Sequence, residues 1–320
     1  MSKYAMRAVR LKVPYRLHLG FYRYSDPPHS FGSTGIVVRE PYFIMSVERV
    51  SGPTVIETPT EESRDLILNT LFRMGVRNGL KVSVEGLVKH HVGLGSRTKL
   101  VMSLLKALTV VGCLGPGTRI DAVARGLGVG RVSGVGIHTF LKGGFVVDTG
   151  VVKLGNALRY PELLLRLRPP PWSVLVAIPE GITGLREKDE EPILSNVEPH
   201  RNQKELYELL IHLTTAVRLS NFGVFSKALS RIQLLAGQYF SRHQGGVYSS
   251  EESALIAETL RRSGVEAVGQ SSWGPTVYGF VEDGRKAARA TAALEGLRAS
   301  LRLDYWVTKT SVRGFLTEAF

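Results

Sequence analysis

The stretch from His90 to Leu108, HHVGLGSRTKLVMSLLKAL, constrains the fold more than any other part of the chain. It passes from a short apolar segment through a glycine-rich turn into apolar residues at helical spacing. That spacing predicts a helix after Gly95, with Ser96 as its N-cap. A helix start leaves backbone N–H groups unpaired and partly positive, and glycines before it let an anion come close. The stretch predicts either a phosphate cradle or a tight turn before a core helix.

The turn matches neither of two common nucleotide-binding motifs. The spacing G-x-x-x-x-G-K-[ST] is absent, and the pattern G-x-G-x-x-G fails at or near Lys99. Arg97 nevertheless adds a guanidinium that can hold two phosphate oxygens at once. The candidate phosphate ligands are Gly93, Leu94, Gly95, Ser96, Arg97 and Thr98.

Composition narrows the class of protein. The chain has 320 residues, of which 43% are hydrophobic, and its one cysteine excludes an internal disulfide. We expect a cytoplasmic protein, since a reducing compartment suits this cysteine usage and no apolar run reaches the roughly 18 residues of a membrane span. The net charge of +13 suggests either nucleic acid or a polyanionic small substrate as partner. The basic residues are dispersed, which favours the small substrate.

The first half of the chain reads as strands and helices that alternate with glycine-rich turns. We expect the first strand to be interrupted at Pro14 and broken at Gly20, and the next apolar runs to be split by Pro41. Further expected elements are helices at 63–76, 96–111 and 116–130 and a strand at 79–88. The segment 134–150 is expected to form two strands joined by a turn at 142–144.

The second half begins at a composition break, RLRPPPW, and we place a domain boundary there, between 1–168 and 169–320. A strand at 173–178 is followed by a charged loop at 186–192 and two helices hinged near Asn221. Ser250 and Ser253 are candidate caps of a third helix. The remaining order, strand, strand, helix, strand, predicts an α+β domain with an antiparallel sheet covered by helices on one side.

Four segments together resemble the archaeal beta-ribofuranosylaminobenzene 5'-phosphate synthase branch of the GHMP kinase superfamily. They are HVGLGSRTKL, GRVSGVGIHTFLKGGFVVDTG, IQLLAGQYFSRHQGGVY and GQSSWGPTVYGF. The resemblance extends over most of the chain, from RLHLG near Arg16 to SSWGPT near Trp273. It implies an N-terminal domain like ribosomal protein S5 domain 2 and a ferredoxin-like C-terminal domain.

The resemblance also implies an activity. Para-aminobenzoate, or an acid like 4-hydroxybenzoate, would condense with phosphoribosyl pyrophosphate and release CO2 and pyrophosphate, on a route to methanopterin-type cofactors. Mg2+ is expected to share the phosphates with the protein. We also expect a homodimer and no membrane partner. The exact aromatic acid is left open.

Other site residues follow from this chemistry. Arg16 or His18 is expected to pair with the aromatic carboxylate, and Trp273 or Phe21 to stack on the ring. Asp148 is expected either to bind Mg2+ or a ribose hydroxyl, or to form a turn. Additional candidates to contact phosphate or border the site are Ser133, Gly134, Ser271 and Ser272. The other histidines show no metal-ligand spacing and are expected to be structural.

Two positions at which this chain differs from members of the superfamily affect which reaction we expect. Kinases of the superfamily commonly carry an aspartate where this chain has Gly136, and a glycine can neither accept a proton nor hold an ion. The synthase branch continues its loop as Gly-Ser-Gly-Thr-Gln, where this chain has Arg97 and Lys99. An ATP-dependent small-molecule kinase and a non-catalytic nucleic-acid-binding protein remain the alternatives.

Overall fold

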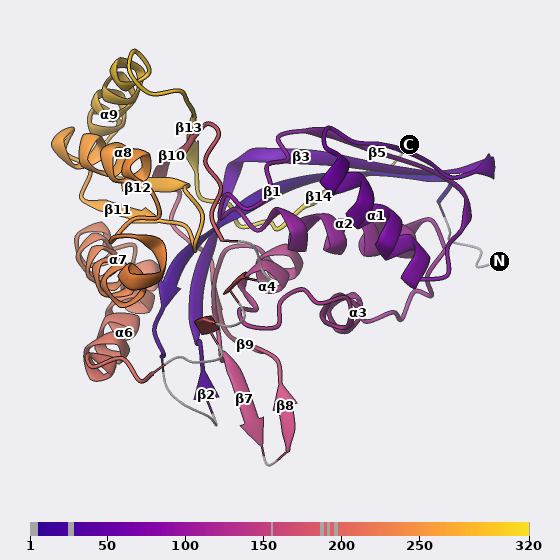
Figure 1. The fold of residues 1–320 in the computed structure, drawn as a ribbon, viewed down its shortest axis with the longest axis horizontal. Coiled ribbons are helices and arrows are strands. Elements are labelled where there is room, and N and C mark those ends of the chain that lie inside the picture. The colour runs from indigo at the N-terminus through magenta and orange to yellow at the C-terminus, as the bar shows by residue number, and fades with distance from the viewer. Residues whose placement is uncertain are drawn as a thin grey trace.

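The computed structural model describes residues 6–24, 29–154, 156–185, 189–190, 193–194 and 198–319. Most of the charged loop expected at 186–192 lies outside these residues. Figure 1 shows two sheets joined near the middle of the molecule, each covered by its own helices.

Two long strands form the centre of the first sheet. β1 (Ala8–Phe21) and β3 (Ser33–Pro53) pair antiparallel, and Val9, Leu11 and Val13 of β1 are fully buried between the partly exposed Arg10 and Lys12. This alternation is that of a strand with one face in the core. The main path of the sheet is completed by β14 (Leu316–Ala319) beside β1, and by β5 (Asn78–Gly86) and β4 (Val55–Glu57) beyond β3.

The interruptions expected at Pro14, Gly20 and Pro41 were wrong, because both strands continue through them. The pairing of β1 with β3 shifts register between Pro14 and Arg16 and again between His18 and Gly20. At the first shift, one residue of β1, Tyr15, lies opposite four residues of β3, 38–41, so Pro41 lies in the bulge. A proline is tolerated there because a bulge leaves residues outside the hydrogen-bond ladder.

Four helices lie on one side of the first sheet (Figure 1), and their apolar residues share one core with those of its strands. They are α1 (Glu61–Arg73), α2 (Ser96–Val110), α3 (Ile120–Gly126) and α4 (Val135–Lys142). The helices expected at 63–76, 96–111 and 116–130 are confirmed.

The first of the two strands expected at 134–150 was wrong, since residues 135–142 form α4. Ile137 and Phe140 are fully buried and pack α4 into the core. The turn itself was correctly placed. Gly143 and Gly144 both have positive φ, which ends the helix and leads into β6 (Phe145–Asp148).

β6 pairs with β3 on one side and with β9 (Leu163–Leu167) on the other. A small sheet projects from this region (Figure 1). It consists of β2 (His29–Ser30), β7 (Val151–Leu154) and β8 (Ala157–Arg159).

The second sheet has four antiparallel strands, in the order β11-β12-β10-β13. Numbered within this half of the chain the order is 2-3-1-4, which is the ferredoxin-like order that the resemblance implies. The strands are β10 (Ser173–Pro179), β11 (Ala267–Gln270), β12 (Val277–Val281) and β13 (Leu303–Lys309).

Helices cover both faces of this sheet, so the expectation of one covered face was wrong. α8 (Glu251–Arg262) and α9 (Gly284–Leu297) pack on the face that carries Leu175 and Ala177. α6 (Gln203–Leu219) and α7 (Phe222–Gln244) belong to the main core with Val174, Val176 and Phe280. Figure 1 shows the two helix pairs on opposite sides of β11 and β12. Successive residues of these strands are apolar on both faces of the sheet. Each face therefore needs a layer of helices to keep it from water.

Of the two candidate caps of the third helix, Ser250 is confirmed, whereas Ser253 was wrong because it lies inside the first turn of α8. Asn221 caps α7 through the N–H of Val224, and Ser250 caps α8 through the N–H of Ser253. None of the helices described here is long and apolar enough to cross a membrane. The chain moves from the first sheet to the second between β9 and β10, and β14 returns to the first sheet. The division at residue 168 stays a prediction.

A close contact of two backbone segments joins the halves. The turn between β11 and β12 lies against the loop before α2, where the Thr276 N–H donates to the carbonyl of Val92 at 3.2 Å. A Cβ added at Gly274 would lie 2.0 Å from the carbonyl carbon of Val92 and 2.1 Å from the nitrogen of Gly93. Backbone atoms cannot yield as a flexible side chain can.

We therefore expect Gly274→Ala to lower the free energy of unfolding by about 3 kcal/mol, because the two segments must separate. Gly284→Ala is the matched control, since no atom lies within 4 Å of a Cβ there. It should not lower stability. Denaturant titration of both variants makes the comparison, and an equal effect at the two glycines would contradict the proposed contact.

Candidate active site

A cavity of about 980 Å³ lies where the two halves of the molecule meet. Its walls come from the end of β1, the first turn of α1, the loop before α2, the loop between α3 and α4, the segment near Leu185 and the turn between β11 and β12. Segments far apart in the sequence thus line one space, and most of the site residues expected from the sequence are among them.

The loop before α2 has the geometry of an anion cradle. Gly93 and Gly95 have φ of 89° and 75°, and both line the cavity. Gly95, not Ser96, is the N-cap, so that expectation was wrong. The Ser96 hydroxyl instead donates to the carbonyl of Lys89 at 2.5 Å. Among the described residues no side chain caps this helix, and its first turn contains no acidic residue, so its N–H groups are not bonded to a capping side chain.

The other loop residues divide between the cavity and the core. Ser96, Arg97 and Thr98 line the cavity, whereas Leu94 is 1% exposed and belongs to the core. Arg97 is exposed at the opening opposite Gly128. Lys99, the second departure from the synthase loop, is fully buried, and its Nζ has no hydrogen-bond partner among the described residues.

Arg16 and His18 extend from β1 on the same side, because residues two apart in a strand share a face. One Arg16 nitrogen donates to the carbonyl of Gly93, and its Nε has no partner in the described part of the chain. Burial lowers the pKa of Arg16 to about 10, against the opposing charge of Glu190, so the guanidinium stays charged at neutral pH. It is a cation held at the base of the glycine loop.

His18 is neutral at physiological pH. Burial, aided by the charge of Arg16, lowers its pKa to about 3. Its Nδ1 accepts from the Gly20 N–H at 3.2 Å, which puts the ring proton on Nε2. Nε2 is buried and has no partner among the described residues. The ring therefore carries one unpartnered N–H donor and no free acceptor.

Asp148 is placed differently from the active-site role expected for it. It is fully buried and does not line the cavity. Its carboxylate accepts from the Ser33 hydroxyl at 2.6 Å, the Gly134 N–H at 2.8 Å and the Gly150 N–H at 2.9 Å. Burial raises its pKa to about 6, and these hydrogen bonds act in the opposite direction. In this geometry Asp148 is a positioning residue.

Asp148 positions the loop that carries Ser133. The Ser133 hydroxyl lies 2.8 Å from that of Ser33 and lines the cavity. Gly134 lies behind it and contributes its N–H only to the buried carboxylate. Of the two residues expected to contact phosphate here, Ser133 can reach a ligand and Gly134 cannot.

The turn between β11 and β12 contributes from the other side. The Ser271 hydroxyl accepts from the His18 N–H at 2.9 Å and donates to the Gly93 carbonyl at 2.7 Å, so it is structural. Ser272 and Trp273 line the cavity, as does Phe21. The two aromatic side chains expected to stack on a ring are therefore at the site.

Gly136 lies where α4 meets α2. A Cβ on Gly136 would lie 2.9 Å from Cγ2 of Thr98, in the first turn of α2. A side chain at this position would therefore have to displace the side chain of Thr98. This geometry gives a structural reason for the glycine that the sequence alone could only record.

Several lining residues were not expected from the sequence. His91 Nε2 lies 2.8 Å from a carboxylate oxygen of Glu62, and His90 Nε2 lies 2.8 Å from the Ser63 hydroxyl. Nothing in the sequence marks them as neighbours. The unexpected polar lining residues are Glu62, Asp65, His90, His91, Arg131 and Glu190. The described residues contain no group of three or more His, Cys, Asp or Glu that could hold a metal by itself.

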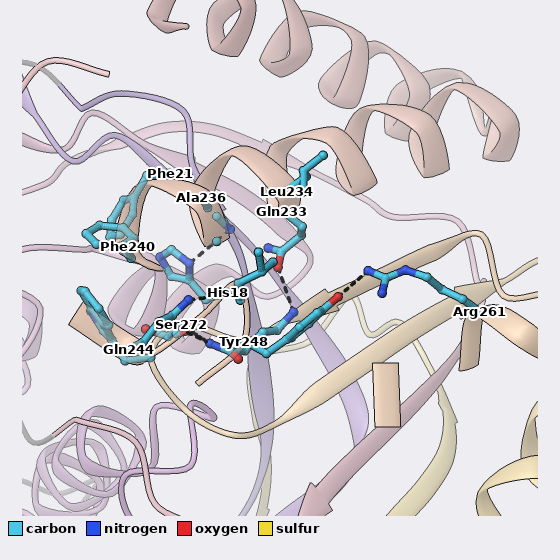
Figure 2. A pocket seen from close by; sticks show the side chains of 15 residues that line it. His18, Phe21, Gln233, Leu234, Ala236, Phe240, Gln244, Tyr248, Arg261 and Ser272 are labelled. Carbon is cyan, nitrogen blue, oxygen red and sulfur yellow. Dashed lines mark hydrogen bonds between the residues drawn. The ribbon is translucent and has the colours of Figure 1, made fainter. Parts of the chain in front are cut away.

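A second, smaller pocket of about 70 Å³ adjoins the cavity and shares four of its lining residues, His18, Phe21, Ser272 and Trp273. Figure 2 shows this pocket, with Phe21 and Phe240 beside His18 and with Tyr248 reaching toward Arg261. Its far wall comes from the end of α7 and the segment after it.

The chain is similar in sequence to archaeal enzymes. It is 27% identical over 314 residues to the beta-ribofuranosylphenol 5'-phosphate synthase of Archaeoglobus fulgidus, covering 94% of this chain and 93% of the relative. It is 26% identical over 302 residues to the protein of the same name from Methanothermobacter thermautotrophicus, covering 85% and 88%. No family model matches the chain. These relatives confirm the resemblance to the synthase branch.

Solved structures of GHMP-family kinases share the fold. Homoserine kinase from Cytophaga hutchinsonii superposes with a TM-score of 0.71 at 15% identity, over 99% of each chain. The mevalonate kinase of L. major, solved with R-mevalonate, also gives 0.71 at 15% identity, over 98% of this chain and 99% of that one. The expected two-part GHMP fold is confirmed.

We expect Gly136→Ala to lower the free energy of unfolding by about 1–2 kcal/mol, because the added methyl meets Thr98, although alanine suits a helix better than glycine. Thr98→Ser removes Cγ2 and should restore most of the loss in the double variant. Denaturant titration of the wild type, the two single variants and the double variant gives the coupling free energy between residues 98 and 136. Additive effects would contradict the contact.

We expect acid to destabilise the wild-type protein more steeply than His18→Gln. The unfolded histidine takes up a proton below about pH 6.5, whereas folded His18 stays neutral down to about 3. The contribution of neutral His18 to the free energy of unfolding is therefore fully present above pH 6.5, and it is lost as the pH falls toward 3. Between pH 6 and 4 the slopes should differ by about 1.4 kcal/mol per pH unit. Denaturant titrations across this range measure the slopes, and equal slopes would refute a neutral His18.

Proposed function

We propose that this protein condenses an aromatic acid with phosphoribosyl pyrophosphate and releases CO2 and pyrophosphate. The printed name of its archaeal relatives describes a ribose 5-phosphate joined to a phenol. The observation that carries the proposal here is the glycine loop, whose uncapped helix start faces a cavity beside the buried cation Arg16. That combination attracts a phosphorylated, multiply charged substrate.

The reaction needs charge stabilisation at two places. The bond between ribose C1 and the pyrophosphate oxygen breaks, and the electron pair leaves with pyrophosphate. Helix N–H groups and fixed cations aimed at that leaving group lower the barrier. We assign this role to the loop from Gly93 to Thr98, with Arg97 at the opening. The hydroxyl of Ser133 faces the same cavity and suits a ribose or phosphate oxygen.

The aromatic ring supplies the nucleophile. The ring carbon that carries the carboxylate forms the new bond to ribose C1. The bond to the carboxyl carbon then breaks, CO2 leaves, and its electron pair restores the aromatic ring, so no external base is required. This chemistry is compatible with Gly136 and with a His18 that cannot accept a proton at neutral pH.

The relatives' name favours one aromatic acid. A phenol product arises from 4-hydroxybenzoate, whereas para-aminobenzoate would give an aminobenzene product. We propose 4-hydroxybenzoate as the acceptor. We assign Arg16, a buried cation that lines the cavity, to its carboxylate, and His18 Nε2 is a donor without an acceptor in the described structure.

Mg2+ remains part of the proposal. The carboxylates lining the cavity are Glu62, Asp65 and Glu190, and none belongs to a ready-made cage among the described residues. This donor set fits an ion held mainly by phosphate oxygens, with one or two protein carboxylates or waters. Bound there, Mg2+ would neutralise charge on the leaving pyrophosphate.

An ATP-dependent kinase is the competing function, since the fold is that of GHMP kinases. The contact between Gly136 and Thr98 argues against it, because a Cβ at Gly136 would already lie 2.9 Å from Cγ2 of Thr98, so a carboxylate side chain there would have to displace that side chain. ATP consumption with a small alcohol as acceptor would favour the kinase.

We expect purified protein with Mg2+, phosphoribosyl pyrophosphate and 4-hydroxybenzoate to release pyrophosphate and CO2 in equal amounts. Enzyme-coupled phosphate detection and labelled carboxylate measure the two products. Pyrophosphate without CO2 would indicate hydrolysis only, and absence of both would refute the proposal.

Arg97→Ala should weaken binding of phosphoribosyl pyrophosphate at least about tenfold, since a charged hydrogen bond contributes about 1.5 kcal/mol or more. Arg298→Ala is the control, because Arg298 is exposed and lies outside both cavities. Calorimetry measures both affinities. Unchanged binding in Arg97→Ala would remove this residue from the phosphate site.

A further inference from the structure

The small pocket is built largely by the segment from Ile232 to Tyr248, for which the sequence suggested no chemical role. Gln233, Ala236, Phe240 and Tyr248 of this segment line it. At about 70 Å³ the pocket is less than a tenth of the size of the adjoining cavity. A small ring fits such a space, whereas a doubly phosphorylated ribose does not.

The wall next to the cavity is aromatic. The rings of Phe240 and Trp273 have centroids 4.4 Å apart, and Phe21 packs edge-on against His18 at 4.9 Å. Both Phe240 and Trp273 are buried. Flat apolar side chains of this kind favour another flat ring.

Three glutamines hold the pocket walls, and their amides are largely occupied. Gln233 accepts from the Gln270 N–H at 2.8 Å and donates to the carbonyl of Leu19 at 3.0 Å. Gln270 accepts from the Ser249 N–H at 2.7 Å and donates to the carbonyl of Ser272 at 3.0 Å. Gln244 donates to the carbonyls of Gly246 and Val247. These side chains fix the shape of the pocket and leave ligand recognition to other groups.

The remaining polar groups lie at opposite ends. His18, with its unpartnered Nε2, lies where pocket and cavity meet. At the other end an Arg261 nitrogen donates to the hydroxyl oxygen of Tyr248. Figure 2 shows this pair on the side of the pocket away from His18, Phe21 and Phe240.

We propose that this small pocket binds the ring of the aromatic acid, with the carboxylate toward His18 and the para substituent toward the pair of Tyr248 and Arg261. The proposal rests on the function proposed above. It identifies the small pocket as the binding site of the second substrate, the aromatic acid. The ring carbon that carries the carboxylate must meet ribose C1. That end of the acid therefore faces the large cavity, and the para substituent points away from it.

The pair of Tyr248 and Arg261 is also suited to bind a hydroxyl group at the para position of the aromatic acid. The Tyr248 oxygen accepts from Arg261, so its own proton is left to donate. Both groups then present donors, which suit a hydroxyl or phenolate oxygen. An aromatic amine offers mainly N–H donors and fits this end less well.

Ala236→Leu tests the location. The larger side chain fills the pocket from α7 without touching the glycine loop, so the affinity for 4-hydroxybenzoate should fall at least about tenfold while that for phosphoribosyl pyrophosphate stays the same. Ala288→Leu, an exposed position of α9 outside both cavities, is the control. Equal calorimetric affinity of wild type and Ala236→Leu for 4-hydroxybenzoate would overturn the proposal, as would loss of both ligands in a folded variant.

Tyr248→Phe tests the orientation. It should weaken 4-hydroxybenzoate about tenfold and leave benzoate, which lacks a para substituent, unchanged. Tyr305→Phe, whose hydroxyl bonds to Glu295 outside the pocket, controls for loss of a hydroxyl. If Tyr248→Phe and Arg261→Ala weaken benzoate as much as 4-hydroxybenzoate, the carboxylate lies at the wrong end and the orientation fails.

Binding and turnover separate the two proposals. If the wild type binds 4-hydroxybenzoate in this pocket but releases neither CO2 nor pyrophosphate, the pocket assignment stands and the reaction fails. If turnover occurs and Ala236→Leu keeps the wild-type KM for the acid, the reaction stands and the pocket assignment fails. Absence of measurable wild-type binding to the acid, with or without phosphoribosyl pyrophosphate present, overturns the assignment.

Discussion

The hydroxyl of Ser271 joins the three segments on which the site depends. It accepts the N–H of His18 from β1 and donates to the carbonyl of Gly93 in the glycine loop, while its own backbone belongs to the turn after β11. Arg16 binds the same carbonyl. Because Ser271 is fully buried, these hydrogen bonds are shielded from water, and losing them would leave unpaired groups inside the protein. Strand, loop and turn therefore keep one mutual geometry.

The same scaffold hosts different chemistry in its structural relatives. The kinases with this fold transfer phosphate, and the relatives in sequence are named as synthases. In this chain the first turns of α2 and α4 touch at Thr98 and Gly136, so any side chain at residue 136 would meet Thr98. A fold thus supplies a phosphate site, and a few side chains around it decide what happens to the phosphorylated molecule.

Local signals in the sequence were sufficient for the long amphipathic helices and for the glycine loop, because periodicity and turn chemistry act over neighbouring residues. They failed at α4, where we expected a strand but the segment forms a helix with Ile137 and Phe140 buried in the core. The sequence signals also did not distinguish Asp148, whose carboxylate fixes the loop at Gly134, from residues that line the cavity. Burial and the meeting of distant segments decide such roles, and neither is visible in the order of residues. The small pocket beside His18 is a case in point, since β1, α7 and the turn after β11 build it jointly.

The place of β14 has a consequence for how the protein is made. Residues 316–319 pair with Val9 to Lys12, so a strand near one end of the sequence covers the edge of a strand near the other. During synthesis that edge of β1 stays open, with its N–H and C=O groups unpaired, until the whole second sheet and then β14 have left the ribosome. An uncovered edge can pair with strands of other chains. The nascent chain is thus most exposed to aggregation before its final strand is complete.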